Sequence, residues 1–259
     1  MSFHANGENL KLGRGALFLA PWAGSTPPAG SLIGEFLGNC TACALASENE
    51  SREKYSSTEQ SSPLLDSRVI RQKYTVTVAL DEHTMHNLKL FMSGDVTSVV
   101  QSLSTVGSIT LTDVTSGHTY YVGARNVTNV AVLLGSTPKV LNTDYTLDAE
   151  QGLVTILATG TIVTGDDLTV TFDQPAATIQ KIRGGTVVSP NYKLTYQADD
   201  ANAGGDASRD RLTVWKASVN ADGELGLIAD DYGGFGLRLE ILSDAVNHAT
   251  EPFFIHERV

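Results

Sequence analysis

Two cysteines three positions apart, Cys40 and Cys43, form a C-x-x-C pattern. Such pairs serve disulfide exchange when a helix N-terminus lowers the thiol pKa, or they bind zinc together with a second pair of ligands. Here the pair lies in a strand-like run, where positions three apart point to opposite faces. No second ligand pair occurs at a suitable spacing in the sequence. We therefore expect two small buried strand residues.

Other groups of potential ligands are equally incomplete. His83 and His86 are three apart on an expected helix, but the H-E-x-x-H spacing and a third ligand are missing, which favours solvated or capping histidines. The acidic segment Asp199–Asp206 resembles a calcium loop. Counted from Asp200, however, the twelfth position is Arg211 instead of a bidentate carboxylate. We expect a polar loop there and no metal site.

Motifs of common enzymes are also absent. The sequence has no P-loop, no dinucleotide-binding glycine pattern and no G-x-S-x-G nucleophile motif. A catalytic triad dispersed along the chain would escape such a search, so the sequence supplies no positive reason to expect an enzyme. We predict that the protein is not an enzyme and that it uses no cofactor.

The composition is that of a folded acidic protein. The 259 residues suffice for one large all-β domain or two smaller ones, with 41% hydrophobic and 18% charged residues. The net charge is −11 and the basic residues are scattered, so we expect DNA at most as passing cargo. No signal peptide or apolar membrane span is recognisable, which predicts a soluble protein made in a cytoplasm.

Alternation of apolar and polar residues dominates the chain and predicts half-buried strands. It is clearest in five runs: Tyr74–Leu80, Ser108–Thr112, Leu168–Phe172, Leu212–Ala217 and Leu237–Ile241. One helix is expected over Asp81–Met92, with Met85, Leu88 and Met92 on its apolar stripe. These signals predict a mainly β fold, a β-sandwich or half-barrel with one flanking α-helix.

The distribution of strands indicates two parts. Residues 105–173 carry their own short strands and turns, which predicts a small inserted β-sandwich-like unit. Residues 1–104 and 174–259 would then form one discontinuous main domain. Within it, the polar segment Ser47–Ser67 lies between the expected strands Leu32–Ala46 and Arg68–Leu80 and predicts a long loop. That loop could be an ordinary surface loop or an arm that orders against a neighbouring subunit.

The order of these elements resembles that of siphophage major tail tube proteins. The likeness rests on the strand pair Ala16–Pro21 and Leu32–Ala46, the long polar loop with Glu-Ser-Arg-Glu, the helix ending near Gly94, and the C-terminal strands. It implies hexameric rings that stack into the tail tube of a virion, with a fold shared by contractile-tail and type VI secretion tubes. The implied partners are other copies of the chain, a tape-measure protein, a tail terminator and a distal tail protein. The inserted unit would then lie on the tube exterior.

The resemblance favours the arm. Ordering about twenty residues costs roughly 1–2 kcal/mol each in backbone entropy, and this segment offers few apolar groups to offset that cost. A neighbouring subunit could compensate by pairing the charges and burying the apolar side chains of the expected inter-subunit residues, which are Glu50, Arg52, Glu53, Lys54, Tyr55, Leu64 and Leu65.

An alternative function is a β-sandwich binding module of the adhesin or carbohydrate-binding type. It would require exposed aromatic residues clustered on one face. Trp22, Tyr120-Tyr121 and Trp215 are dispersed in the sequence, which does not favour it.

Overall fold

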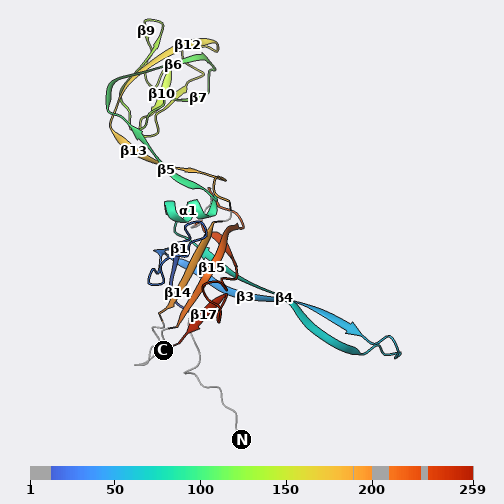
Figure 1. Ribbon diagram of the computed structural model, residues 1–259. Helices are drawn as coiled ribbons and strands as arrows, with labels where there is room; N and C mark the ends of the chain where they lie inside the picture. The colour runs from blue at the N-terminus through green and yellow to red at the C-terminus, as the bar shows by residue number, and fades with distance from the viewer. Residues whose placement is uncertain (1–12, 189, 200–209, 229–232, 259) are drawn as a thin grey trace, which may run out of the picture. The chain divides into compact units, whose positions relative to one another are not determined.

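The computed structural model describes residues 13–188, 190–199, 210–228 and 233–258 (Figure 1). The chain divides into two compact units: unit 1 comprises residues 1–96 and 182–259, and unit 2 comprises residues 97–181. The inserted unit is therefore wider at both ends than the predicted 105–173. The flanking strands β5 (Asp95–Gln101) and β13 (Ala177–Arg183) pair with each other and carry the chain into and out of unit 2.

Unit 1 is built on one antiparallel sheet. Its strands follow the order β2-β1-β14-β15-β16-β4-β3, and β17 pairs with the first part of β15, ahead of the segment that β16 pairs with. The bounds are Gly15–Pro21 (β1), Glu35–Phe36 (β2), Cys40–Tyr55 (β3), Leu64–Leu80 (β4), Asn191–Ala198 (β14), Arg211–Asp222 (β15), Phe235–Ile241 (β16) and Phe254–Glu257 (β17).

The core of unit 1 follows from the predicted alternation. In β16 the side chains at 235, 237, 239 and 241 are buried, while those between them are only half-buried. Apolar residues of β1, β4, β14 and β15 meet the same cluster, including Leu17, Leu19, Val76 and Leu194. Because β1 and β4, which lie next to the two end strands, share this one core, the sheet curves around it without closing into a barrel.

The single described helix, α1 (Met85–Phe91), is shorter than predicted and turns another face to the core. Thr84 caps it by accepting a hydrogen bond from the Asn87 backbone N–H at 3.1 Å, so Asp81 and Glu82 lie outside it. Its buried residues are Asn87 and Leu90, and the predicted stripe of Met85, Leu88 and Met92 was wrong. A polar residue on the buried face leaves no hydrophobic signal in the sequence.

Unit 2 has two sheets and a core of its own. One sheet has the order β10-β11-β7 and the other β6-β12-β8-β9. The bounds are Ser104–Val114 (β6), Thr119–Tyr121 (β7), Thr128–Leu134 (β8), Thr137–Pro138 (β9), Tyr145–Asp148 (β10), Leu153–Ile156 (β11) and Asp166–Gln174 (β12). The side chains between the sheets, such as Val154, Leu168 and Val170, are fully buried. The mainly β sandwich fold with one helix is thus confirmed.

Candidate assembly surface

The segment predicted as a long polar loop is a two-stranded ribbon. Strands β3 and β4 pair continuously, apart from local bulges, from Cys40 opposite Leu80 to Tyr55 opposite Leu64. Strand β16 supports β4 only at residues 75–80, so residues 47–73, called the arm below, continue beyond the sheet (Figure 1). The loop prediction for Ser47–Ser67 was therefore wrong. Its backbone groups are satisfied by the partner strand, which requires no apolar alternation.

The arm is exposed on both faces. Every residue from 47 to 73 is exposed except Ser56, which is buried, and Pro63, which is half-buried. The turn at its tip is closed by a 2.9 Å hydrogen bond from the Ser56 N–H to the Pro63 carbonyl. An isolated two-stranded hairpin is marginally stable in water. The arm accordingly depends on its continuity with the sheet of unit 1.

The predicted charged residues lie along this ribbon. Glu50 is opposite Arg71, with 3.0 Å between its Oε2 and the Arg71 Nη1. Lys54 is opposite Asp66, while Arg52 is opposite Arg68, a like-charged pair that the strands alone would not favour. All four predicted charged residues thus lie on one strand, β3, at solvent-exposed positions.

The apolar residues of the arm are unusually exposed. Tyr55, Leu64 and Leu65 are 53%, 50% and 62% exposed, and Tyr55 faces Leu64 across the two strands. Tyr55 also donates its hydroxyl hydrogen to Glu53, which raises the pKa of Tyr55. The predicted arm residues did not include Val69 and Ile70, 55% and 45% exposed, because these two were placed in the expected strand Arg68–Leu80. All five predicted and missed apolar groups would be buried only by another molecule.

The outer edge of β3 is a second feature of this surface. β3 lies last in the strand order, so one side of its 16-residue backbone has no strand partner among the described residues. An open edge of this length can accept a strand from another chain. Charged residues at 48, 50, 52, 53 and 54 lie along this edge strand and limit unspecific pairing.

The two cysteines lie at the start of β3, within the part of the strand that belongs to the sheet of unit 1. Both line a groove of about 640 Å³ whose apolar side chains include Leu17, Val76 and Leu212. A bulge between Cys40 and Ala42 shifts the strand phase, so that both cysteines reach the same groove and the predicted opposite orientation was wrong. Cys40 is half-buried and Cys43 is exposed, whereas both were predicted to be buried.

The environment of the thiols does not activate them. Burial, helped by Cys43, Asp81 and Glu82, raises the pKa of Cys40 to about 11. Cys43 is exposed as a residue, yet desolvation by the atoms around its thiol raises its pKa as well. Both groups are therefore protonated thiols at neutral pH, without the lowered pKa of a reactive cysteine.

His83 lies before the helix cap Thr84, whereas His86 lies within the helix, so the two side chains have different environments. The His86 ring is only 9% exposed, with Nδ1 2.6 Å from Glu35 Oε2, so the expectation of a solvated or capping residue was wrong for His86. Burial lowers its pKa, although Glu35 opposes this effect. The His83 ring instead packs against Phe235 at 5.3 Å. Within the described ranges no three His, Cys, Asp or Glu residues are grouped to hold a metal ion.

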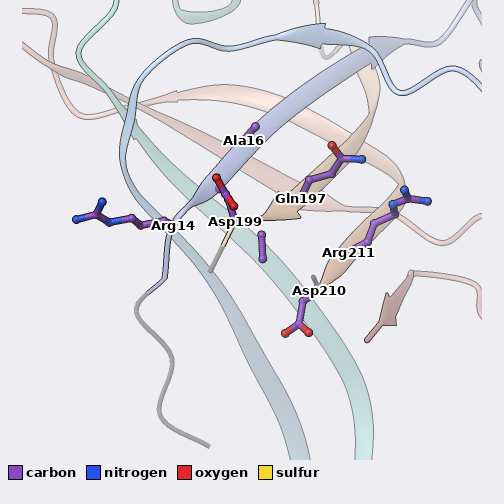
Figure 2. A pocket seen from close by; sticks show the side chains of 8 residues that line it. Arg14, Ala16, Gln197, Asp199, Asp210 and Arg211 are labelled. Carbon is purple, nitrogen blue, oxygen red and sulfur yellow. The ribbon is translucent and has the colours of Figure 1, made fainter. Parts of the chain in front are cut away.

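A polar pocket of about 530 Å³ lies beside the start of β1 and the facing ends of β14 and β15. Arg14, Asp199, Asp210 and Arg211 line it, and Figure 2 shows that the two arginine side chains point away from each other. Asp210 is engaged by His256 at 3.5 Å and Arg258 at 3.8 Å. Most of the predicted calcium-like loop, residues 200–206, lies outside the described residues. Among the lining residues that the structure describes, no set of catalytic groups converges.

The two tryptophans, dispersed in sequence, are adjacent in space. Trp22 Nε1 donates a hydrogen bond of 3.1 Å to the Trp215 carbonyl. Their faces are occupied from within the chain: the Lys216 ammonium lies 4.7 Å from the Trp22 ring, and His248 stacks on Trp215 at 3.7 Å. One face of each ring is therefore covered from within unit 1, and both tryptophans are half-buried.

A family model described as "Protein of unknown function UCP028589" matches residues 10–253. No curated protein matches the chain. Among the described residues, no helix is long and apolar enough to cross a membrane.

Proposed function

We propose that this chain, which belongs to the family of unknown function UCP028589, is the subunit of a self-assembling tube of the phage tail-tube type. Its role would be structural. The subunits would form rings, which the resemblance implies to be hexameric, and the rings would stack into the conduit through which DNA leaves the virion. The arm is the observation that carries the proposal. It would act as the contact between one subunit and the next.

The exposed apolar groups of the arm support this role. Five large apolar side chains lie on a ribbon with no layer over either face: Tyr55, Leu64, Leu65, Val69 and Ile70. Because each is about half exposed, full burial against a neighbour would contribute about 1 kcal/mol per side chain. The arm contributes no residue to the core of unit 1. Its apolar side chains would therefore be buried only if another molecule covered them. A second copy is the partner that a tube requires.

The charge of the arm supports a second copy as that partner. Its five acidic residues (Glu48, Glu50, Glu53, Glu59, Asp66) balance its five basic ones (Arg52, Lys54, Arg68, Arg71, Lys73), so the arm is neutral and the remaining chain carries the net −11. Two copies therefore repel each other less through the arm than through the rest of their surface. The alternating charges would fix the register of docking more than its affinity.

The unpaired edge of β3 fits the same proposal. In a closed ring every subunit contributes the same surface, and open strand edges are covered by the next subunit. The acidic remainder of the chain would let DNA slide through such a tube without binding tightly. The tape-measure, terminator and distal tail proteins, and a location in the virion tail after synthesis in a host cytoplasm, follow from the resemblance and belong to the proposal.

Shortening the arm tests the proposal. Glu48 and Lys73 face each other in the ribbon, so replacing residues 49–72 by Asn-Gly closes the two strands with a tight turn. The core residues of unit 1 are untouched, so the variant should fold and melt like the parent. We expect the parent to form rings or tubes in negative-stain images at high concentration and the shortened variant to remain monomeric by size-exclusion chromatography.

Point variants distinguish the effect of the apolar contacts of the arm from the effect of its length. Tyr55→Ser with Leu65→Ser keeps the ribbon but removes two exposed apolar groups, and should also prevent assembly. Val246→Ser is the matched control, because Val246 is 94% exposed, lies in unit 1 outside the arm, and should not affect assembly. Normal tubes from the shortened variant, or a parent that stays monomeric under all conditions, would reject the proposal.

A further inference from the structure

Unit 2 carries a cleft of about 530 Å³ of its own, apart from the arm. Its walls come from strands β5, β7, β11 and β13, together with the loop after β7, which carries Arg125, and the turn before β11, which carries Gln151. An exposed aromatic ring, Tyr121 at 49%, lies beside the apolar side chains of Val99, Leu153 and Ile179. The polar part of the lining consists of Arg125, Gln151, Gln180 and Lys181. A flat ring beside side-chain amides and cations is a combination that suits a polar ring-shaped ligand with a negative charge.

The basic residues of unit 2 are concentrated at this cleft, although the unit as a whole is acidic. Residues 97–181 contain three basic residues (Arg125, Lys139, Lys181) and seven acidic ones, which gives 3 − 7 = −4. Two of the three basic residues line this cleft, and no acidic residue does. The third, Lys139, is held elsewhere by Thr161 at 2.9 Å. The cleft is thus the one place on unit 2, among its described residues, where positive charge gathers.

The side chains of the lining are also free to bind. Within the described part of the chain, none of Tyr121, Arg125, Gln151, Gln180 and Lys181 makes a side-chain hydrogen bond or ion pair. By contrast, Arg71 is paired with Glu50 and Arg183 with Asp95. Two unpartnered cations and two amides therefore remain for a ligand that brings its own carboxylate and hydroxyl groups.

The cleft is held by a buried clamp. Gln101, 8% exposed, accepts a hydrogen bond from the Arg125 N–H and donates one to the Arg125 carbonyl, both at 2.9 Å. The same amide also donates to the Pro175 carbonyl at 2.9 Å. On the other side, the Val122 N–H donates to the carbonyl of Gly152, a residue at φ +66° where a Cβ would clash with the Ala124 carbonyl. The backbone that presents Arg125 is therefore fixed before any ligand arrives, which lowers the entropic cost of binding.

From these features we infer that the cleft of unit 2 binds a carboxylate-bearing saccharide, with Arg125 and Lys181 on the carboxylate, Tyr121 against the sugar ring, and Gln151 and Gln180 on hydroxyl groups. Such acidic sugars include uronates and nonulosonates, and the shared chemistry is one carboxylate on a hydroxylated ring. The inference does not depend on tube formation, because the cleft lies entirely within unit 2.

Titration of the full-length protein with tetragalacturonate, sialyllactose, neutral maltotetraose and inorganic phosphate tests it by calorimetry. We expect at least one acidic saccharide to bind and maltotetraose and phosphate not to bind. Arg125→Gln and Lys181→Gln should each weaken that binding about tenfold, the loss expected for one hydrogen bond to a charged group. Lys139→Gln is the matched control, since it removes the third cation of unit 2 outside the cleft, and it should change affinity less than about twofold.

Each of the remaining outcomes would overturn the inference. Phosphate that binds as tightly as the saccharides would mean unspecific attraction of anions. A loss in Lys139→Gln equal to that in Arg125→Gln would place binding outside the cleft. No binding of either acidic saccharide to a protein whose circular dichroism is unchanged would remove the ligand class itself. A variant with normal binding after Tyr121→Ala would exclude the proposed stacking.

Discussion

Arg71 Nη1 lies 3.0 Å from Glu50 Oε2 across the two strands of the arm, and both side chains remain exposed, by 78% and 53%. An ion pair this open to solvent contributes at most about 1 kcal/mol to folding. Its position on the arm, in contrast, makes it available to a second subunit. Substitutions at these two residues can therefore test the effect on assembly with little effect on folding.

Exchanging the two charges gives the first prediction. Glu50→Arg combined with Arg71→Glu keeps the cross-strand pair but reverses its direction, so the melting temperature should change little. If the arm docks on a fixed pattern of charges, assembly should weaken while folding does not. Thermal melting and sedimentation of the same samples measure the two effects. Unchanged sedimentation would show that this pair has no part in the contact.

Asn87 provides a prediction about the helix. Its Nδ2 donates to the Leu37 carbonyl at 2.7 Å and to the Glu82 carbonyl at 3.0 Å, and the residue is fully buried. Asn87→Ala leaves both carbonyls without this donor and should cost about 1–3 kcal/mol of unfolding free energy. Urea unfolding measures it. Thr84→Ala, which removes the helix cap, should cost about 1 kcal/mol and serves as the comparison.

His86 should make stability depend on pH. Burial holds its pKa below the ordinary 6.5, so the unfolded chain binds a proton more readily than the folded one. The contribution of the neutral ring is fully present above pH 6.5 and is lost as the pH falls from 6.5 towards the lower folded pKa. His86→Phe should flatten the unfolding free energy between pH 7 and pH 5. Glu35→Gln should steepen it, because Glu35 favours the protonated ring.

The thiols should react slowly at neutral pH. With the pKa of Cys40 at about 11 and that of Cys43 also raised, little thiolate is present below pH 9. We expect the rate of reaction with a disulfide reagent to rise steeply between pH 9 and pH 11. Cys40→Ser and Cys43→Ser separate the two rates. Fast reaction at pH 7 would contradict the protective environment of the groove.

The strands could be predicted where burial imposes alternation, and they were missed where it does not. Leu168–Phe172 and Leu237–Ile241 lie in β12 and β16 as predicted, because one face of each packs on a core. The arm has no buried face, so Ser47–Ser67 gave no period-two signal even though the backbone is paired throughout β3. The predicted strand Arg68–Leu80, which includes Val69 and Ile70, therefore began later than β4, which starts at Leu64.

The candidate sites depend on pairings that a sequence does not display. The charged residues 50–54 were identified because they are contiguous, but their partners Asp66 and Arg71 depend on strand register. The cleft of unit 2 brings Val99, Tyr121 and Lys181 together from three separate strands. No spacing rule connects such positions, so the uneven distribution of basic residues over unit 2 becomes informative only once the fold is known.

The division into two units leads to the last prediction. The two cores share no residue, since one draws on β1, β4, β14, β15, β16 and α1, and the other on strands and loops within residues 111–172. In unit 1 the ends of the cut remain tied after removal of residues 97–181. Arg183 Nη2 lies 2.9 Å from Asp95 Oδ2, and the Gly185 N–H donates to the Met92 carbonyl at 2.9 Å. A short Gly-Ser linker from Val96 to Ile182 should therefore leave unit 1 folded and able to assemble.

Residues 97–181 expressed alone should also fold, and the melting transitions of the two pieces should match those of the full chain. Insoluble protein from both pieces would show that the units depend on each other for folding, whereas a folded unit 1 that no longer assembles would assign the inserted unit a part in the contact between subunits.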